Sequence, residues 1–457
     1  MELSNSSKED THLDEDNLRW MATHDALTAL PNRAQFMAQK HELMGSLGEH
    51  QKCAVFVLDL DKFKPVNDRF GHKVGDEVLK VVAKRLSACV DQGVVARVGG
   101  DEFGILCAFS TEDTLEEIAA GILHKLHQPI HVAHLQITVG ASIGYTVCSA
   151  GVNEYNPFFF RDGSASEAAF RRADMALHAA KAEGRGRCCR FQREMEEELL
   201  RRVELEGEIA GAIQSGQIVP FYQPIVDMRC GRVLGFEMLA RWKHPEKGLI
   251  YPDVLIPVVE STGCIGAMTY HLLRQALRDA KGWPNDVFVS INLSPLQFED
   301  AWVAGNILAI AREASFPLSR IQVEITESAL ATNLEGARSI VDFLQRFGVR
   351  ITLDDFGAGY AGVRYLRQFK FDSLKIDRSF ITDLASSPED IRIVKAIVAF
   401  CQALNIEVVP EGVETEATGD LLLELGCLIG QGYLYGKPQA APQAQSYFRS
   451  EAAPLSA

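Results

Sequence analysis

The chain has 457 residues, of which 47% are hydrophobic and 23% charged, and its formal net charge is −15. This composition is typical of a globular protein and excludes collagen-like, disordered and disulfide-scaffold classes. At about 100–200 residues per domain, we expect two or three domains. The negative charge argues against a broad nucleic-acid surface, so we expect no nucleic-acid partner, and any bound phosphate must be met by a few Lys or Arg or by metal ions.

The ten cysteines lack CxxC and zinc-finger spacing, which indicates a reduced, cytoplasmic protein. The first ten residues, MELSNSSKED, are polar and acidic and do not resemble a signal peptide. No uncharged apolar run approaches the roughly 18 residues that span a bilayer, so we predict no direct membrane span.

Two sequence patterns divide the chain. The segment REMEEELLRRVELEGEIA between them is charge-dense, with apolar residues among the charges, and is typical of an amphipathic helix. We therefore predict a polar N-terminal arm (1–20), a first domain (21–192), a linker helix (193–214), a second domain (215–448) and a C-terminal tail (449–457).

The first domain mixes strand and helix patterns. CAVFVLDLD is typical of a buried strand, and VVARV, GGDEF and GILCAF predict a hairpin with a Gly-Gly turn. A further strand is expected over 135–147, with helices over 76–90 and 167–184. These elements predict an α+β domain with an antiparallel sheet.

Acidic residues lie at the strand end and at the hairpin turn of this domain. Neighbouring strands that bring Asp59 and Asp101 together would hold metal ions over a triphosphate. The candidate phosphate contacts are Lys64, Lys181 and Arg185. Taken alone, Gly-Gly-Asp is also an ordinary turn sequence.

Four motifs occur in order: DALTALPNR (25–33), DLDKFKPVNDRFGHKVGD (59–76), ARVGGDEF (96–103) and ADMALHAAKAEGR (173–185). Together they resemble the GGDEF diguanylate cyclase family, whose fold is that of a nucleotide cyclase or polymerase palm. The resemblance implies Mg²⁺ with GTP, the metal being held by Asp59, the Leu60 carbonyl and Asp101. It also implies catalytic roles for Asp101 and Lys64.

The same resemblance implies the remaining GTP contacts. Asn67 and Asp76 would recognise guanine with His72 nearby, whereas Lys64, Lys181 and Arg185 would contact phosphates. Because one domain carries one GTP, synthesis of cyclic di-GMP (c-di-GMP) requires a homodimer. The family's product-inhibition pair, Arg-x-x-Asp, is replaced by Val90 and Gly93.

The second domain repeats strand-like segments separated mostly by helical ones. Eight such segments over about 250 residues predict a (β/α)8-type barrel. They are VPFYQPI, VLGFEML, VFVSINL, IQVEIT, VRITLDD, SLKID, IEVVPE and LIGQGY.

Polar residues recur near the ends of these strands. Strand ends converge on one rim of such a barrel, where several carboxylates and one Asn would form an oxygen cage for Mg²⁺ or Mn²⁺. The paired Asp354 and Asp355 suggest a second ion, which suits phosphodiester hydrolysis, and Lys375 could hold hydroxide or phosphate. A single strand-end carboxylate is more often a helix cap, but six strands that carry them together favour a site.

The second domain resembles an EAL-domain c-di-GMP phosphodiesterase. The signature stands as Glu237-Met238-Leu239, and YQPI, NLS, EITES, DDFGAGY, LKIDRSF, EGVE and QGY follow the family pattern over roughly 215–440. The resemblance implies two ions, the first held by Glu237, Asn292, Glu324 and Asp354, and the second by Asp354, Asp355 and Glu411. Lys375 would assist the attacking water, and Gln223, Arg241 and Gln431 would hold the dinucleotide or the metal shell.

The favoured interpretation is an enzyme with both activities. The first domain would condense two GTP into c-di-GMP or bind GTP as a regulator, and the second would hydrolyse c-di-GMP to pGpG, which we favour as the net activity. A separate sensor protein is an expected partner. The alternative is a non-catalytic c-di-GMP or GTP receptor that signals through protein partners.

Overall fold

The computed structural model describes residues 20–46, 52–90, 93–148, 165–357 and 362–448. The chain forms two compact units, Met1–Arg201 and Arg202–Ala457, and the boundary falls within the long helix α7 (Arg193–Gln214). The predicted C-terminal tail and all but the last residue of the predicted N-terminal arm lie outside the described residues. None of the described helices is long and apolar enough to cross a membrane.

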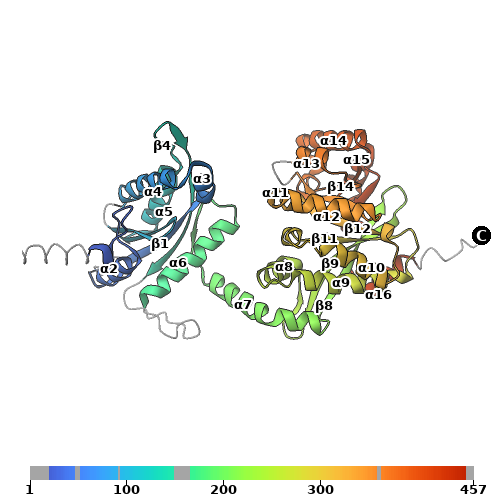
Figure 1. Ribbon diagram of the computed structural model, residues 1–457, viewed down its shortest axis with the longest axis horizontal. Coiled ribbons are helices and arrows are strands. Elements are labelled where there is room, and N and C mark those ends of the chain that lie inside the picture. The colour runs from blue at the N-terminus through green and yellow to red at the C-terminus, as the bar shows by residue number, and fades with distance from the viewer. Residues whose placement is uncertain (1–19, 47–51, 91–92, 149–164, 358–361, 449–457) are drawn as a thin grey trace, which may run out of the picture. The chain divides into compact units, whose positions relative to one another are not determined.

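The N-terminal unit is built on a five-stranded sheet (Figure 1). Neighbouring strands are antiparallel, except that the short edge strand β7 runs parallel to β6. The strand order is β2 (Gly93–Gly99), β3 (Glu102–Phe109), β1 (Lys52–Asp61), β6 (Gly140–Cys148) and β7 (Cys188–Arg190). The predicted hairpin and antiparallel sheet are thus confirmed.

Helices cover both faces of this sheet because β1 is apolar on both. Phe56 and Leu58 pack with α3 (Phe63–Phe70), α4 (His72–Ser87) and α5 (Glu112–His127), whereas Val55 and Val57 pack on the face of α2 and α6. These two helices span Arg33–Ser46 and Ala165–Ala182. A Cβ at Gly144 would lie 2.0 Å from the Leu177 backbone nitrogen, so glycine permits the close approach of α6 to β6.

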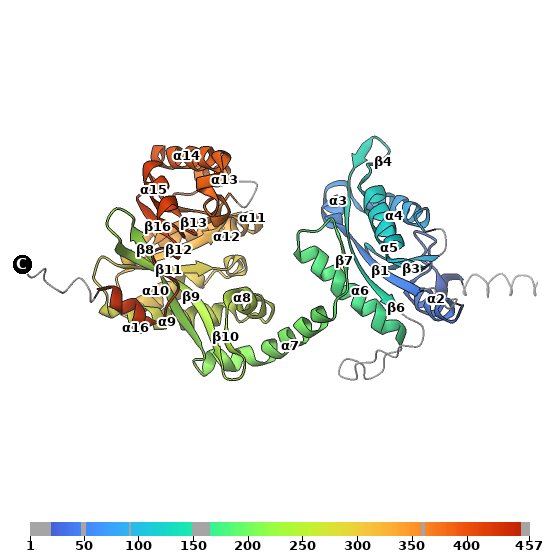
Figure 2. The same ribbon diagram turned by 180° about the vertical axis from the view of Figure 1, so that it is seen from behind.

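The C-terminal unit contains a nine-stranded sheet that curls into a nearly closed barrel, seen from two sides in Figures 1 and 2. Its eight-strand path is β15 (Glu407–Pro410), β14 (Ser373–Ile376), β13 (Arg350–Phe356), β12 (Ile321–Thr326), β11 (Phe288–Leu293), β9 (Arg232–His244), β8 (Ile218–Asp227) and β16 (Ile429–Gln431). All eight predicted strands are present, and β10 (Gly248–Ile250) adds a hairpin to β9.

The barrel departs from an all-parallel arrangement at its first strand. β8 is antiparallel to both β9 and β16. The reason is the short turn between β8 and β9, in which the Gly231 amide donates to the Asp227 carbonyl at 2.8 Å. A parallel connection needs a crossover of about a dozen residues, which this turn does not provide.

Helices follow most of the later strands and cover the outside of the barrel. They are α8 (Pro252–Ser261), α9 (Ile265–Asp279), α10 (Val303–Glu313), α11 (Glu327–Thr332), α12 (Leu334–Arg346), α13 (Gly362–Gln368), α14 (Pro388–Ala403), α15 (Glu416–Glu424) and α16 (Ala441–Ala444). The carboxyl ends of the parallel strands consequently meet at one rim.

Candidate active site

A buried lysine lies at the centre of this rim. The Lys375 side chain on β14 is 1% exposed, and its Nζ lies 3.1 Å from Glu237 Oε2 and 2.8 Å from Glu324 Oε2. The same Nζ lies 2.6 Å from Glu411 Oε1 and 3.5 Å from Asp354 Oδ1. Although burial alone lowers the pKa of Lys375, these carboxylates outweigh it and raise the pKa well above its usual value. Lys375 is therefore a permanent cation and hydrogen-bond donor here.

Two amides hold Glu237 from its other sides. Asn292 Nδ2 donates to Glu237 Oε1 at 2.7 Å, and Gln431 Nε2 donates to Glu237 Oε2 at 2.6 Å. Burial raises the pKa of Glu237, but the Lys375 charge and these hydrogen bonds outweigh it, so the pKa is lowered. By contrast, burial and the Glu237 and Asp354 charges raise the pKa of Glu324 despite its contact with Lys375.

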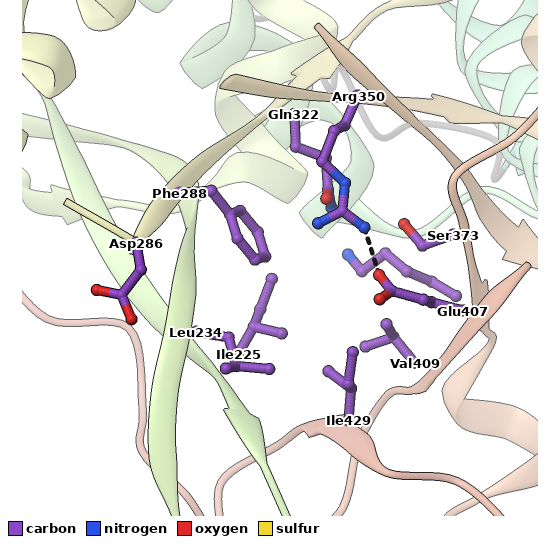
Figure 3. A pocket seen from close by; sticks show the side chains of 11 residues that line it. Ile225, Leu234, Asp286, Phe288, Gln322, Arg350, Ser373, Glu407, Val409 and Ile429 are labelled. Atoms are coloured by element: carbon purple, nitrogen blue, oxygen red, sulfur yellow. Dashed lines mark hydrogen bonds and ion pairs between the residues drawn. The ribbon is translucent and has the colours of Figure 1, made fainter. Parts of the chain in front are cut away.

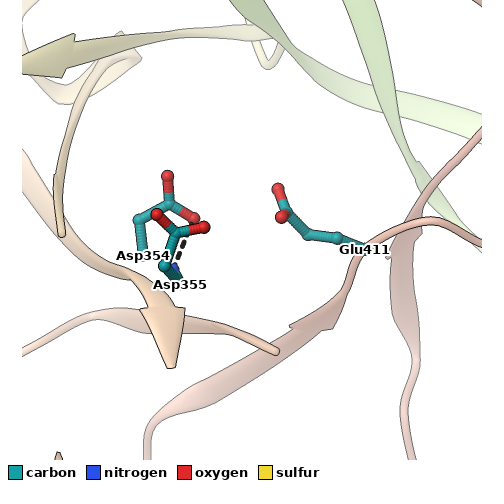
Figure 4. A group of neighbouring side chains, drawn as sticks. All are labelled: Asp354, Asp355 and Glu411. Atoms are coloured by element: carbon teal, nitrogen blue, oxygen red, sulfur yellow. Dashed lines mark hydrogen bonds between the residues drawn. The ribbon is translucent and has the colours of Figure 1, made fainter. Parts of the chain in front are cut away.

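Three carboxylates form a cluster suited to a cation (Figure 4). Asp354, Asp355 and Glu411 each place an oxygen within 4.8 Å of the others. Burial and neighbouring negative charge raise the pKa of Asp355 to about 6 and that of Glu411 to about 8. Asp355 adopts the left-handed region at φ 54°, with its amide 3.0 Å from Asp354 Oδ1. Crowded carboxylates of this kind fit a divalent cation with oxygen ligands.

One further acceptor faces the same region. Gln431 Oε1 is buried and has no hydrogen-bond partner among the residues that the structure describes. Since the amide of Gln431 is committed to Glu237, the free oxygen is available to a metal-bound water or to a ligand.

Arg241 and Gln223 lie beside this cluster, on the hairpin of β8 and β9. Gln223 is directly opposite Glu237 in the ladder. Arg241 is 6% exposed, and its guanidinium lies 5.6 Å from the Phe221 ring centroid and 5.0 Å from that of Tyr251. The guanidinium is thus held between two rings, close enough to Glu237 for the charge of that carboxylate to act on it.

A second cavity lies at the amino ends of the parallel strands (Figure 3). Its volume is about 180 Å³, and Arg350, Phe288, Ser373 and Lys375 are among its lining residues. Arg350 forms an ion pair with Glu407 there. This end of the barrel carries none of the predicted site residues apart from Lys375.

Five of the predicted residues of the N-terminal unit line a cleft of about 300 Å³. Its lining residues include Lys64, Asn67, His72, Asp76 and Asp101. The residues come from α3, α4 and the hairpin turn, so the tertiary structure brings together segments that are up to 37 positions apart.

Asp59 lies close enough to Asp101, a lining residue of the cleft, for their charges to interact. Burial, followed by the Asp59 charge, raises the pKa of Asp101, and the Leu60 amide donates to the Asp101 carbonyl at 3.3 Å. Lys181 Nζ lies 2.8 Å from Asp59 Oδ2, so in this structure it contacts a predicted metal ligand. Arg185 is exposed at φ 63° and is not among the residues that line the cleft.

Comparison with known proteins identifies both parts of the chain. Residues 22–187 match the family described as "Diguanylate cyclase, GGDEF domain", and residues 206–438 match the family described as "EAL domain". The chain belongs to the tandem GGDEF–EAL family. The N-terminal unit is therefore its GGDEF domain and the barrel its EAL domain.

Individual relatives extend over both domains. The Bifunctional diguanylate cyclase/cyclic di-GMP phosphodiesterase MucR of Pseudomonas aeruginosa is 35% identical over 93% of this chain and 61% of its own length. The Cyclic di-GMP phosphodiesterase PdeR of Escherichia coli is 34% identical over 95% of this chain and 64% of its own. This chain spans about half to two thirds of the length of the first curated relatives that it matches.

The EAL domain also resembles solved structures. One, described as "PaMucR Phosphodiesterase, c-di-GMP complex", is 38% identical, with a TM-score of 0.50; the match covers 53% of this chain and 99% of the other. That structure is described as a complex with c-di-GMP, and its likeness to the barrel extends over nearly the whole of its length.

Sequence reasoning missed the residues that support the GGDEF site. Arg97 donates to the Gly100 carbonyl from Nε at 2.9 Å and from Nη2 at 2.7 Å, while its Nη1 lies 3.0 Å from Asp25 Oδ1. Asp61 Oδ2 accepts from the Gly186 amide at 3.0 Å. All three residues, Arg97, Asp25 and Asp61, lie inside the four motifs. The available signal was therefore a charged residue within a motif to which no ligand had been assigned.

In the EAL domain, Ser290 was missed in the same way. Its hydroxyl donates to Glu324 Oε1 at 2.6 Å, which leaves Oε2 of Glu324 for Lys375. Ser290 is two residues before Asn292 on β11, and both side chains face the barrel interior because strand residues alternate. A polar residue at this spacing inside an apolar strand was the available signal.

Proposed function

We propose that the EAL domain hydrolyses c-di-GMP to linear pGpG in a metal-dependent reaction. The observation that carries this proposal is the cluster of buried carboxylates at one barrel rim, in which Lys375 contacts four acidic groups and Asp354, Asp355 and Glu411 could hold a cation. Relatives named as cyclic di-GMP phosphodiesterases support the substrate class.

The residues of the EAL site fall into two groups, those that would hold metal ions and those that would contact the substrate or water. Glu237, Asn292, Glu324 and Asp354 would hold one Mg²⁺ or Mn²⁺, and Asp354, Asp355 and Glu411 a second. When bound, such ions lower the pKa of a coordinated water and offset charge on the phosphate. Arg241 would meet a non-bridging phosphate oxygen, and Gln223 and Gln431 would orient substrate or water.

In the hydrolysis, a water oxygen forms a new bond to phosphorus and loses one proton, the bond from phosphorus to a 3′-oxygen breaks, and that oxygen takes up one proton, so that no net proton is released. Lys375 remains an ammonium because the neighbouring acidic groups, Asp354 and Glu237 foremost, raise its pKa despite its burial. It therefore does not act as a base, and we assign it to hold Glu237 and Glu324 in place. Its third N–H, which contacts Glu411 in this structure, would turn toward the attacking water when Glu411 holds the ion.

For the GGDEF domain we propose a GTP site in the cleft between α3, α4 and the hairpin. Asn67, Asp76 and His72 would face guanine, and Lys64 and Arg185 the phosphates. Lys181 would exchange Asp59 for phosphate once Mg²⁺ is held by Asp59, the Leu60 carbonyl and Asp101. Condensation to c-di-GMP needs two such domains face to face, hence a homodimer, in a compartment that contains GTP, for which we propose the cytoplasm.

One experiment tests these activities. Purified protein is incubated with Mg²⁺ and either c-di-GMP or GTP, with EDTA as the control, and the nucleotides are separated by chromatography. We expect pGpG from c-di-GMP in the Mg²⁺ sample and none with EDTA. Tight binding of c-di-GMP without any pGpG would instead support a receptor that signals through protein partners.

A further inference from the structure

The end of strand β9 carries groups on two opposite faces. Glu237 and Arg241 are four residues apart and therefore lie on one face, whereas Trp242 and His244 lie on the other. Trp242 is fully buried, and its Nε1 donates to Gln217 Oε1 at 3.0 Å, just beyond the end of α7. The helix thus supports the back of the strand whose front presents Arg241.

His244 makes three hydrogen bonds at this point. Its Nδ1 lies 3.1 Å from the backbone amides of both Glu246 and Lys247, and its Nε2 lies 2.7 Å from Glu208 Oε2 on α7. Backbone amides only donate, so Nδ1 must accept, and the neutral imidazole carries its proton on Nε2. That proton is then donated to Glu208, so the turn and the helix are joined through one ring of defined tautomer.

A second link joins the same helix to the same turn. Lys247 Nζ lies 3.1 Å from Glu204 Oε2, one helical turn before Glu208. Between these two carboxylates, Leu205 of α7 is 1% exposed and belongs to the same core cluster as Trp242. The C-terminal half of α7 therefore holds the turn between β9 and β10 by packing, by an ion pair and by the His244 hydrogen bonds.

We propose that α7 sets the position of Arg241 through the Glu208–His244 hydrogen bond, so that Glu208 and His244 are positioning residues of the EAL site. Arg241 is three residues before His244 on a strand whose two faces are both occupied, so a shift of the helix moves the guanidinium with the strand. This inference rests on the proposed contact between Arg241 and a phosphate of c-di-GMP. Helix α7, which leads into the first barrel strand, then belongs to the substrate-binding apparatus.

The test uses the full chain and three variants. E208A removes the acceptor on α7, and H244N keeps an acceptor near the position of Nδ1 while it removes the Nε2 donor. E206A is the matched control, because Glu206 lies on the same helix but contacts Ser261 Oγ at 2.6 Å and Arg202 Nε at 3.1 Å. We expect E208A and H244N to raise KM for c-di-GMP by about 3- to 10-fold with kcat within about twofold, and E206A to match the wild type.

A double substitution separates positioning from a general effect on stability. In an R241K background, which keeps the charge but loses the planar guanidinium, E208A should raise KM no further. An equal rise in both backgrounds, an unchanged KM in E208A, or a fall in kcat together with the melting temperature would overturn the proposal. If wild type binds but does not hydrolyse c-di-GMP, the proposed function fails, and the same comparison of variants is made on the calorimetric Kd.

Discussion

The two sites of this chain differ in how completely one copy builds them. In the EAL domain, Lys375 is 1% exposed and contacts four acidic side chains, three of them on strands and the fourth, Glu411, directly after β15. In the GGDEF domain, the corresponding cation–carboxylate contact, between Lys181 and Asp59, leaves the two side chains 26% and 18% exposed. The barrel surrounds its site, whereas the cleft of the sheet is open.

This difference has a physical cause. Strand ends of a barrel converge from all sides, so their side chains meet with little water between them and perturb one another's pKa. The edge of an open sheet supplies groups from one side, and the other side must come from substrate or from a second copy. The activity of the EAL site should therefore depend on single buried residues of one copy. The activity of the GGDEF site should depend both on its own residues and on association with a second copy.

The largest effect should come from breaking the barrel site. We expect Glu237→Ala to lower the rate of pGpG formation by about 100-fold or more, because the change removes a proposed metal ligand that also receives hydrogen bonds from Asn292 and Gln431. The measurement is chromatographic analysis of c-di-GMP hydrolysis, with Glu424→Ala on an exposed part of α15 as the control. Hydrolysis near the wild-type rate would show that Glu237 is not a ligand.

A substitution in the GGDEF domain tests the more open of the two sites. We expect Asp101→Ala to abolish GTP turnover to c-di-GMP, by about 100-fold or more, while hydrolysis by the barrel stays within about twofold. Asp113→Ala, on the exposed surface of α5, is the control. Persistent synthesis in the Asp101 variant would disprove the assignment. If the wild type makes no c-di-GMP, a regulatory GTP site predicts that added GTP raises the hydrolysis rate.

The raised carboxyl pKa values predict a pH dependence of metal binding. With a pKa of about 8, Glu411 carries a proton at pH 7 in the metal-free site, and Asp355, with a pKa of about 6, begins to protonate as the pH falls. Protons and the metal ion compete for the same carboxylate oxygens. The affinity for the metal ion should therefore rise as the pH increases from 6 to 8, by up to about tenfold per pH unit.

Calorimetric titration with Mn²⁺ at pH 6, 7 and 8 checks this dependence. The protein should carry Asp101→Ala, which removes a proposed ligand of the other metal site. Glu411→Gln in the same background should flatten the dependence near pH 8 because the titrating group is absent. An affinity that does not change with pH would contradict the predicted protonation.

The smallest expected effect concerns product inhibition. The wild-type GGDEF domain should escape it because Val90 and Gly93 lack the charged groups of the family's inhibitory pair, whose bonds are worth about 1.5–3 kcal/mol each. The structure adds that a Cβ at Gly93 would lie 2.1 Å from the Leu106 carbonyl oxygen. The double change V90R/G93D should therefore fail to create inhibition.

The inhibition measurement is GTP turnover with added c-di-GMP in the Glu237→Ala background, which prevents destruction of the product. We expect the same turnover with and without micromolar c-di-GMP, both in that protein and in the version that carries V90R/G93D. If c-di-GMP slows turnover in the Glu237→Ala protein, inhibition occurs through another site. If it slows turnover only in the protein that also carries V90R/G93D, the backbone near Gly93 can shift to accommodate the new side chain.

Much of the fold could be predicted because its signals are local. Each of the eight barrel strands contains an apolar run of its own, and the Gly-Gly hairpin is marked by its own glycines. The reversed direction of β8 was not predicted, since direction depends on the length of the turn at Gly231 rather than on the pattern of the strand itself. The site residues remain predictions, although the structure brings most of them together in two places.

The sequence by itself determined the family, the order of the two domains and the residue types available to each site, since these follow from motifs of a few neighbouring residues. Tertiary structure decided which groups meet. Lys375 and Glu237 are 138 positions apart, and His244 and Glu208 are 36 apart, yet each pair is in hydrogen-bond contact. Nothing in a local pattern encodes such a distance, because it results from strand register and helix packing summed over the whole barrel.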